Sequence, residues 1–334
     1  RRILDGNFTT GAGQLKQIEM IERYIERIVS DVRLARPLKV VIDCGNGAAG
    51  AVAPELYRRL GCEATELFCE VDGNFPNHHP DPSRPENLQD LIQAVWEQEA
   101  EFGMAFDGDG DRLGVVGPPG GAGDAIIWPD RQLTLFARDV LSRQPGAEII
   151  YDVKCSQIVP RAIEEAGGRA TMGKTGHSFM KAALQESGAA LAGEMSGHVF
   201  FQERWYGFDD GLYAGARLCE LLSRDERAPG EVFAAIPDTV NTPELHLHTE
   251  EGAHHALVAE LVKKAHFDDG RVSTIDGIRV DFENGFGLVR ASNTTPTVIM
   301  RFEAENEPAL AAIQERFRVL IHSVRPELEL ELLF

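Results

Sequence analysis

The sequence has no apolar run long enough to span a bilayer, and it is poor in positive charge. Lys and Arg together number 33, against 53 Asp and Glu, which gives a formal net charge of -20. Because such a surface repels nucleic acid, we expect no nucleic-acid partner, and because no apolar run spans a bilayer, we expect no membrane partner. An anionic substrate would therefore need basic side chains gathered in one place.

Cysteine is also scarce and lacks the C-x-x-C spacing of zinc and redox sites. An odd number of cysteines without that spacing favours reduced thiols over a disulfide scaffold, and predicts a cytoplasmic protein. The five cysteines are Cys44, Cys62, Cys69, Cys155 and Cys219.

Two stretches of the chain repeat one pattern of elements. Residues 15–34 have helical spacing of apolar residues, and residues 38–67 then read as strand, glycine turn, helix ending at Gly61, and strand. Residues 147–172 repeat the strand, the Asp-containing turn, the helix and the strand. The pattern predicts two related mixed α/β sheet domains, joined near residues 117–124.

The last part of the chain has a different pattern. After the Pro/Thr-rich link 236–244, strand-like runs alternate with turns, and a helical stretch closes the sequence. This order predicts a C-terminal α+β domain.

The stretch "FDGDGDR", residues 106–112, places Asp107, Asp109 and Asp111 at alternate positions. An extended segment would point these carboxylates to one side, and the glycines allow the backbone to close around a small ion. Hard oxygen ligands suit Mg²⁺ or Mn²⁺, whereas Arg112 and Pro118 stand where a calcium loop needs Gly and Glu. Arg112 can offset part of the charge and hold a phosphate oxygen.

The stretch "GRATMGKT", residues 168–175, matches the phosphate-loop pattern of nucleotide hydrolases. A charged helical stretch precedes it, however, and its middle residues read as a strand. The context favours an ordinary strand followed by a loop that offers Lys174 and His177 at the strand end, where α/β sheets place ligands.

Two further stretches carry groups that suit a phosphorylated sugar. In "AGEMSGH", residues 192–198, Glu194 and Ser196 suit adjacent hydroxyls and His198 can move a proton, although a surface turn is an equal alternative. In "RASNTTP", donors without an acid favour a phosphate cradle over a simple capped turn. These donors are Arg290, Ser292, Asn293 and Thr294.

Together these motifs resemble the α-D-phosphohexomutase family, in its bacterial phosphomannomutase/phosphoglucomutase branch. "FDGDGDR", "TGHS", "GEMSGH" and "RASNTTP" occur in the family order, and residues 69–82 and "FDDG", 208–211, fit the same branch. The resemblance implies four domains, of which this chain holds the second, third and fourth. We expect residues 1–22 to be the tail and linker of a missing first domain. The predicted domains are 23–125, with the metal loop, 126–237, with the sugar loop, and 238–334, with the phosphate loop.

The resemblance also implies the reaction and its participants. Family members interconvert 6-phospho and 1-phospho sugars through a 1,6-bisphosphate, using Mg²⁺ and a phosphoserine in a T-[AG]-S-H-N-P loop that these 334 residues lack. We therefore expect two partners, a phosphorylated hexose and the phosphoserine domain, and no mutase activity from this chain alone.

The resemblance implies roles for the candidate residues as well. The three aspartates would bind the metal, Glu194 and Ser196 the ring hydroxyls, and the "RASNTTP" loop the non-reacting phosphate. Four residues are candidates for catalysis, and the general acid or base among them stays open: Arg112, Lys154, His177 and His198. The alternatives are phosphoglucosamine mutase, a nucleotide hydrolase that uses Lys174, and a non-catalytic sugar-phosphate-binding protein.

Overall fold

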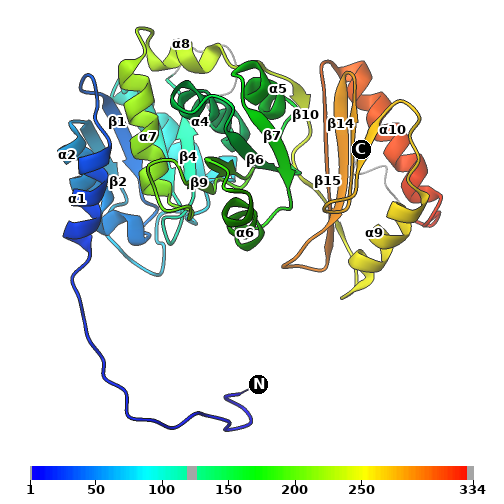
Figure 1. Cartoon of the computed structure of the whole chain (residues 1–334), viewed down its shortest axis with the longest axis horizontal. Coiled ribbons are helices and arrows are strands. Elements are labelled where there is room, and N and C mark those ends of the chain that lie inside the picture. Colours follow the sequence, from blue (N-terminus) through cyan, green and yellow to red (C-terminus); the bar gives the residue numbers. More distant parts are fainter. Residues whose placement is uncertain (1, 119–125, 329–334) are drawn as a thin grey trace.

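The computed structural model describes residues 2–118 and 126–328. Figure 1 shows three sheets side by side in chain order, with residues 2–20 running away from them as an extended segment. The predicted joint at 117–124 falls largely outside the described residues. Within the described residues, no helix is both long enough and apolar enough to cross a membrane.

The first helix is shorter than its sequence predicts. Helix α1 spans Ile21–Asp31, and it buries Ile25 and Ile28. The prediction of helix over residues 15–20 is wrong, since Leu15 lies 93% exposed in an extended stretch. An isolated helical turn is unstable in water, so the helix begins only where its apolar side chains reach the core.

The first sheet has the strand order β2-β1-β3-β4-β5. β1 is parallel to β2 and β3, whereas β4 runs antiparallel to β3. The predicted helix is α2, and it ends at Gly61, whose φ of +97° suits glycine. The elements are β1 (Lys39–Asp43), η1 (Ala48–Ala51), α2 (Ala53–Leu60), β2 (Glu63–Leu67), η2 (Pro85–Leu88), α3 (Gln89–Glu97), β3 (Phe102–Phe106), β4 (Leu113–Val116) and β5 (Ile126–Ile127).

The second sheet repeats this topology with the order β7-β6-β8-β9. β6 is parallel to β7 and β8, and β9 is antiparallel to β8, so the internal repeat is confirmed. Its elements are α4 (Pro129–Arg143), β6 (Glu148–Asp152), α5 (Ile158–Glu165), β7 (Arg169–Gly173), α6 (His177–Ser187), β8 (Leu191–Gly193), β9 (Val199–Phe201), α7 (Gly211–Arg224) and α8 (Pro229–Ala234).

The C-terminal unit is the predicted α+β domain. Strands β12 to β15 form an antiparallel meander, and β10 and β11 both pair with β15. Its elements are β10 (Val240–Asn241), β11 (Leu245–His248), α9 (Ala253–Lys264), β12 (Arg271–Ser273), β13 (Ile278–Phe282), β14 (Gly285–Ala291), β15 (Thr297–Ala304) and α10 (Glu307–His322).

The apolar core shows how the units are joined. One cluster of buried side chains runs through both α/β sheets, from Val40 to Leu191, whereas the C-terminal sheet packs its own cluster around Phe302 and Phe317. Because the first two sheets share a core, the turns at their strand ends have fixed positions relative to one another.

Candidate active site

Two turns at equivalent places in the two α/β sheets meet at the centre of the site. One turn, residues 107–112, joins β3 to β4, and the other, residues 194–198, joins β8 to β9. Arg112 forms a β-bridge with His198, and the Leu113 amide donates to the Gly197 carbonyl over 3.1 Å. The fold thus brings the predicted metal turn against the predicted sugar turn.

The metal turn is bent, so the predicted extended segment is wrong. At Gly110, whose φ is +83°, the backbone reverses direction before it continues to Asp111. The carboxylates of Asp107, Asp109 and Asp111 nevertheless converge, with ligand oxygens within 4.8 Å of one another. Three hard carboxylate oxygens around one point fit Mg²⁺.

The electrostatics of this turn also suit a cation. Arg112 Nε lies 2.8 Å from Asp107 Oδ2, and its Nη1 lies 2.9 Å from Asp81 Oδ1. Burial raises the pKa of Asp107 above its usual range even though Arg112 lowers it. One guanidinium therefore does not compensate the buried charge, which a divalent ion would do.

The sugar turn forms a connected polar cluster. Glu194 is buried and accepts hydrogen bonds from the Gly176 amide at 2.6 Å and from Ser196 Oγ at 3.1 Å. His198 Nδ1 lies 3.3 Å from Glu194, and its Nε2 lies 3.3 Å from Asp111 Oδ1. Burial would lower the pKa of His198, but these two carboxylates raise it to about 9. The motif alone did not predict the Gly176 amide or Asp111 as partners of these side chains.

Asp209 lies in the "FDDG" stretch, whose pattern alone predicted no role for it. Its buried carboxylate pairs with Lys181 at 2.9 Å, and its Oδ2 lies 3.8 Å from His177 Nδ1 and 3.9 Å from His198 Nε2. The imidazole rings of His177 and His198 stack with centroids 5.8 Å apart. The fold therefore brings both predicted histidines together beside one carboxylate.

The two lysines of the sequence analysis lie at ends of neighbouring strands. Residues 169–173 form strand β7 rather than a phosphate-binding loop, so the nucleotide-hydrolase alternative does not fit. Lys174 follows β7 and lies over the Phe179 ring, 5.7 Å from its centroid. Lys154 follows β6, is buried, and places Nζ 2.7 Å from Glu244 Oε1.

The phosphate cradle differs in detail from its prediction. Arg290 lies within strand β14 rather than on the loop, and its Nε pairs with Asp276 at 3.0 Å. Its Nη2 is buried without a hydrogen-bond partner among the residues described. Ser292 Oγ accepts from the amides of Thr294 and Thr295 at 3.3 and 3.2 Å. A buried, partly unpaired guanidinium is suited to an incoming anion.

The cradle also contacts the second α/β unit. Asn293 Nδ2 lies 3.4 Å from the Thr175 carbonyl, and the Thr175 amide donates to Asp276 over 3.1 Å. The loop after β7 therefore contacts both the loop after β14 and Asp276, the ion-pair partner of Arg290.

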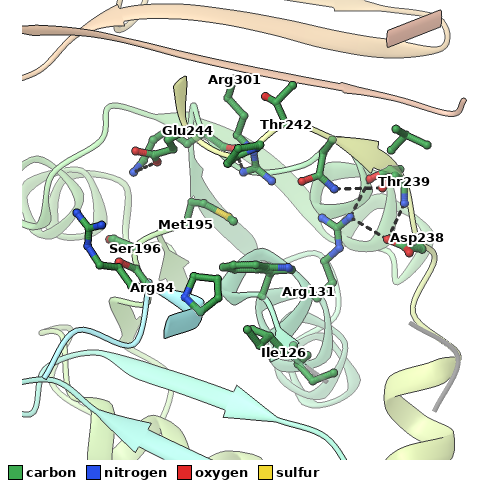
Figure 2. Close-up of a pocket in the computed structure, with 18 of the residues that line it drawn as sticks. Arg84, Ile126, Arg131, Met195, Ser196, Asp238, Thr239, Thr242, Glu244 and Arg301 are labelled. Atoms are coloured by element: carbon green, nitrogen blue, oxygen red, sulfur yellow. Dashed lines mark hydrogen bonds and ion pairs between the residues drawn. The ribbon is translucent and has the colours of Figure 1, made fainter. Parts of the chain in front are cut away.

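A cavity of about 800 Å³ connects the sugar turn to the C-terminal unit. Figure 2 shows Met195 and Ser196 on one side of it, with Glu244 and Arg301 across from them. The far end is lined by Arg131, which bonds Thr239 in the link between units over 2.8 Å. The cavity thus extends from the predicted sugar-binding groups to the link.

Comparison with known proteins agrees with this arrangement. Three family models match, described as "Phosphoglucomutase/phosphomannomutase, alpha/beta/alpha domain II" over residues 22–120, domain III over 128–240, and the C-terminal domain over 244–320. A phosphomannomutase/phosphoglucomutase of Pseudomonas putida is 53% identical over 98% of this chain and 70% of its own length.

A second relative and a solved structure are also phosphoglucomutase or phosphoglucomutase/phosphomannomutase proteins. A phosphoglucomutase of Neisseria gonorrhoeae is 56% identical over 93% of this chain and 67% of its own length. A crystal structure of a phosphoglucomutase/phosphomannomutase family protein from Burkholderia thailandensis is 54% identical, with a TM-score of 0.92 over 98% of this chain and 69% of that one. The chain belongs to the phosphoglucomutase/phosphomannomutase family.

Proposed function

We propose that this chain provides the metal, sugar and phosphate sites of a phosphohexomutase that interconverts the 6-phosphates and 1-phosphates of mannose and glucose. The relatives at 51–56% identity are named phosphomannomutase/phosphoglucomutase or phosphoglucomutase. The observation that carries the proposal is the contact between the two turns. Asp107, Asp109 and Asp111 converge beside Glu194, Ser196 and His198.

The chain's own residues divide the tasks of such a reaction. Bound Mg²⁺, held by the three aspartates, would supply charge neutralisation for phosphoryl transfer. Arg112 holds the metal turn through Asp107, and Glu194 with Ser196 would orient ring hydroxyls. His198 Nε2 lies 3.3 Å from Asp111 Oδ1, and the His177 ring stacks against that of His198. Either histidine can serve in proton transfer, and Lys154 can contact phosphate.

These 334 residues contain no T-[AG]-S-H-N-P loop, so the proposed reaction would take its phosphoryl group from a serine outside them. A hexose 1,6-bisphosphate would then be the intermediate, and it would have to turn so that each phosphate meets the donor. The "RASNTTP" cradle would hold the phosphate that is not reacting. The five cysteines are all free, which supports our placement of the enzyme in the cytoplasm.

The test joins domain I of the Pseudomonas putida relative to residue 1 and follows conversion of glucose 1-phosphate to glucose 6-phosphate. We expect turnover that requires Mg²⁺ in the fusion, and none in the 334-residue chain or in a fusion with the phosphoserine changed to alanine. Turnover of glucosamine phosphate in preference to both glucose and mannose phosphates would assign the alternative substrate. Binding of sugar phosphates without any turnover in the fusion would contradict a catalytic role.

A further inference from the structure

The ammonium group of Lys154 is paired with a carboxylate from another unit of the fold. Lys154 follows β6 of the second α/β sheet, whereas Glu244 ends the link that leads into the C-terminal unit. Their Nζ and Oε1 atoms are 2.7 Å apart. Both residues line the cavity that also reaches Ser196, and Figure 2 shows Glu244 on its wall.

The two partners differ in how freely they can move. The Lys154 side chain is 9% exposed, whereas that of Glu244 is 30% exposed. The ammonium is therefore fixed in a buried place, while the carboxylate stands at the cavity edge on a link between units. Glu244 can turn toward water at modest cost, but Lys154 then needs another anion, because an unpaired buried charge is costly.

A second cation of the site has the same kind of partner. Arg290 Nε pairs with Asp276 Oδ2 at 3.0 Å. Burial and, to a smaller extent, the charge of Arg290 lower the pKa of Lys154, but the carboxylates of Glu244 and Asp152 raise it above its usual range. Lys154 and Arg290, which come from different units, are thus each paired with a carboxylate. A phosphate monoester offers the same cations an equivalent negative charge with more acceptor oxygens.

We propose that Glu244 is a built-in competitor of the substrate, whose carboxylate holds Lys154 until the phosphate group of a sugar phosphate displaces it. The inference rests on the proposed function and goes beyond it, because it assigns a residue that weakens binding. Each phosphorylated ligand must spend part of its binding free energy on displacing Glu244, so the affinity for all of them is reduced equally. A bisphosphate that must release one phosphate and turn around benefits from such weakened binding.

The experiment is a double-mutant cycle read by calorimetric titration of the 334-residue chain with glucose 1-phosphate. Glu244→Gln removes the competing charge and keeps the size, so we expect the dissociation constant to fall about three- to tenfold. Lys154→Met should weaken binding, and Glu244→Gln should then have no further effect. Glu251→Gln removes an exposed charge from the same unit and is the matched control, with no expected change.

Weaker or unchanged binding by Glu244→Gln would overturn the inference, since a residue that merely positions Lys154 gives that result. Equal tightening in the Lys154→Met background would also overturn it, because the effect would then be a general one of net charge. If Glu244→Gln does not fold, Glu244→Asp keeps the charge but withdraws the carboxylate, and we expect a smaller tightening of the same sign. If the unaltered chain binds neither glucose nor mannose phosphates, the proposed function itself fails. If that chain binds them but the variants do not tighten, only the competitor role fails.

Discussion

The turn that follows β3 and the turn that follows β8 lie at equivalent places in two sheets of one topology, but their side chains suit different ligands. The first turn offers three carboxylates and one guanidinium, and the second offers a carboxylate, a hydroxyl and an imidazole. The repeated fold therefore determines where a turn lies, whereas the residues of each turn determine its ligand. Contact between the two turns places these two sets of side chains next to each other.

The ends of the first strands extend this comparison. Asp43 ends β1, accepts from the Gly45 amide at 2.9 Å and pairs with His78, whereas Asp152 ends β6 and accepts from Thr175 Oγ1 at 2.8 Å. Each aspartate closes the loop after its strand. The first loop packs against the metal turn, where the Ala48 amide donates to the Gly108 carbonyl over 2.9 Å, while the second carries Lys154.

If one turn binds the metal and the other the sugar ring, the phosphate group of the substrate must be bound by the C-terminal unit. Arg290→Ala removes the buried guanidinium, and we expect a loss of roughly 1.5–3 kcal/mol of binding free energy, or about ten- to a hundredfold in dissociation constant. Titration calorimetry with glucose 1-phosphate and glucose 6-phosphate should show the loss for both. Unchanged affinity for both in a folded variant would move the phosphate to the loop around Lys174 and His177.

The metal side of the comparison can be altered without changing a carboxylate. A Cβ at Gly47 would lie 2.8 Å from the Gly108 carbonyl oxygen, in the backbone of the metal turn. Gly47→Ala should therefore cost about 1–3 kcal/mol of unfolding free energy and weaken Mn²⁺ binding, because the turn must shift. Denaturant unfolding and Mn²⁺ titration measure the two effects, with the exposed Gly73→Ala as control. Full Mn²⁺ affinity in Gly47→Ala would show that the turn does not depend on this contact.

The interaction of His78 with Asp43, at the end of β1, can be tested by its dependence on pH. Its hydrogen bond with Asp43 raises the pKa of His78 from 6.5 to about 9, although burial opposes the shift. The charged form therefore stabilises the folded protein fully below about pH 6.5, and this stabilisation is lost as the pH rises through 9. We expect His78→Gln to lower the unfolding free energy by roughly 1–2 kcal/mol at pH 6 and by much less at pH 9.5. Chemical denaturation across this range would contradict the account if the difference did not change with pH.

The smallest expected effect concerns the hydroxyl of the cradle. Ser292 Oγ is the centre of hydrogen bonds to Thr294 and Thr295, so Ser292→Ala removes a neutral group that shapes the loop. We expect a loss of about 1 kcal/mol in glucose 6-phosphate affinity, smaller than that of Arg290→Ala. A loss that exceeds the arginine variant's would show that loop shape, rather than charge, dominates phosphate binding.

Local patterns predicted much of this molecule, and long-range partners account for what they missed. The strand–helix repeat and the four motifs are encoded in short stretches, as is the stop at Gly61. Glu244, Asp209 and Asp276 escaped prediction because each meets its cation through tertiary contacts, as Glu244 does with Lys154, 90 positions away. The bend at Gly110 and the late start of α1 likewise depend on backbone geometry and packing that alternation and periodicity do not specify.

The division of ligands between the two turns is tested most directly by measuring both ligands on two variants. Mn²⁺ and, in the presence of chelator, glucose 6-phosphate are titrated into the unaltered chain, Asp109→Asn and Glu194→Gln. We predict that Asp109→Asn lowers Mn²⁺ affinity by at least about tenfold and leaves sugar-phosphate affinity within about twofold, while Glu194→Gln does the reverse. Equal losses of the same ligand in both folded variants would contradict the division of labour between the turns.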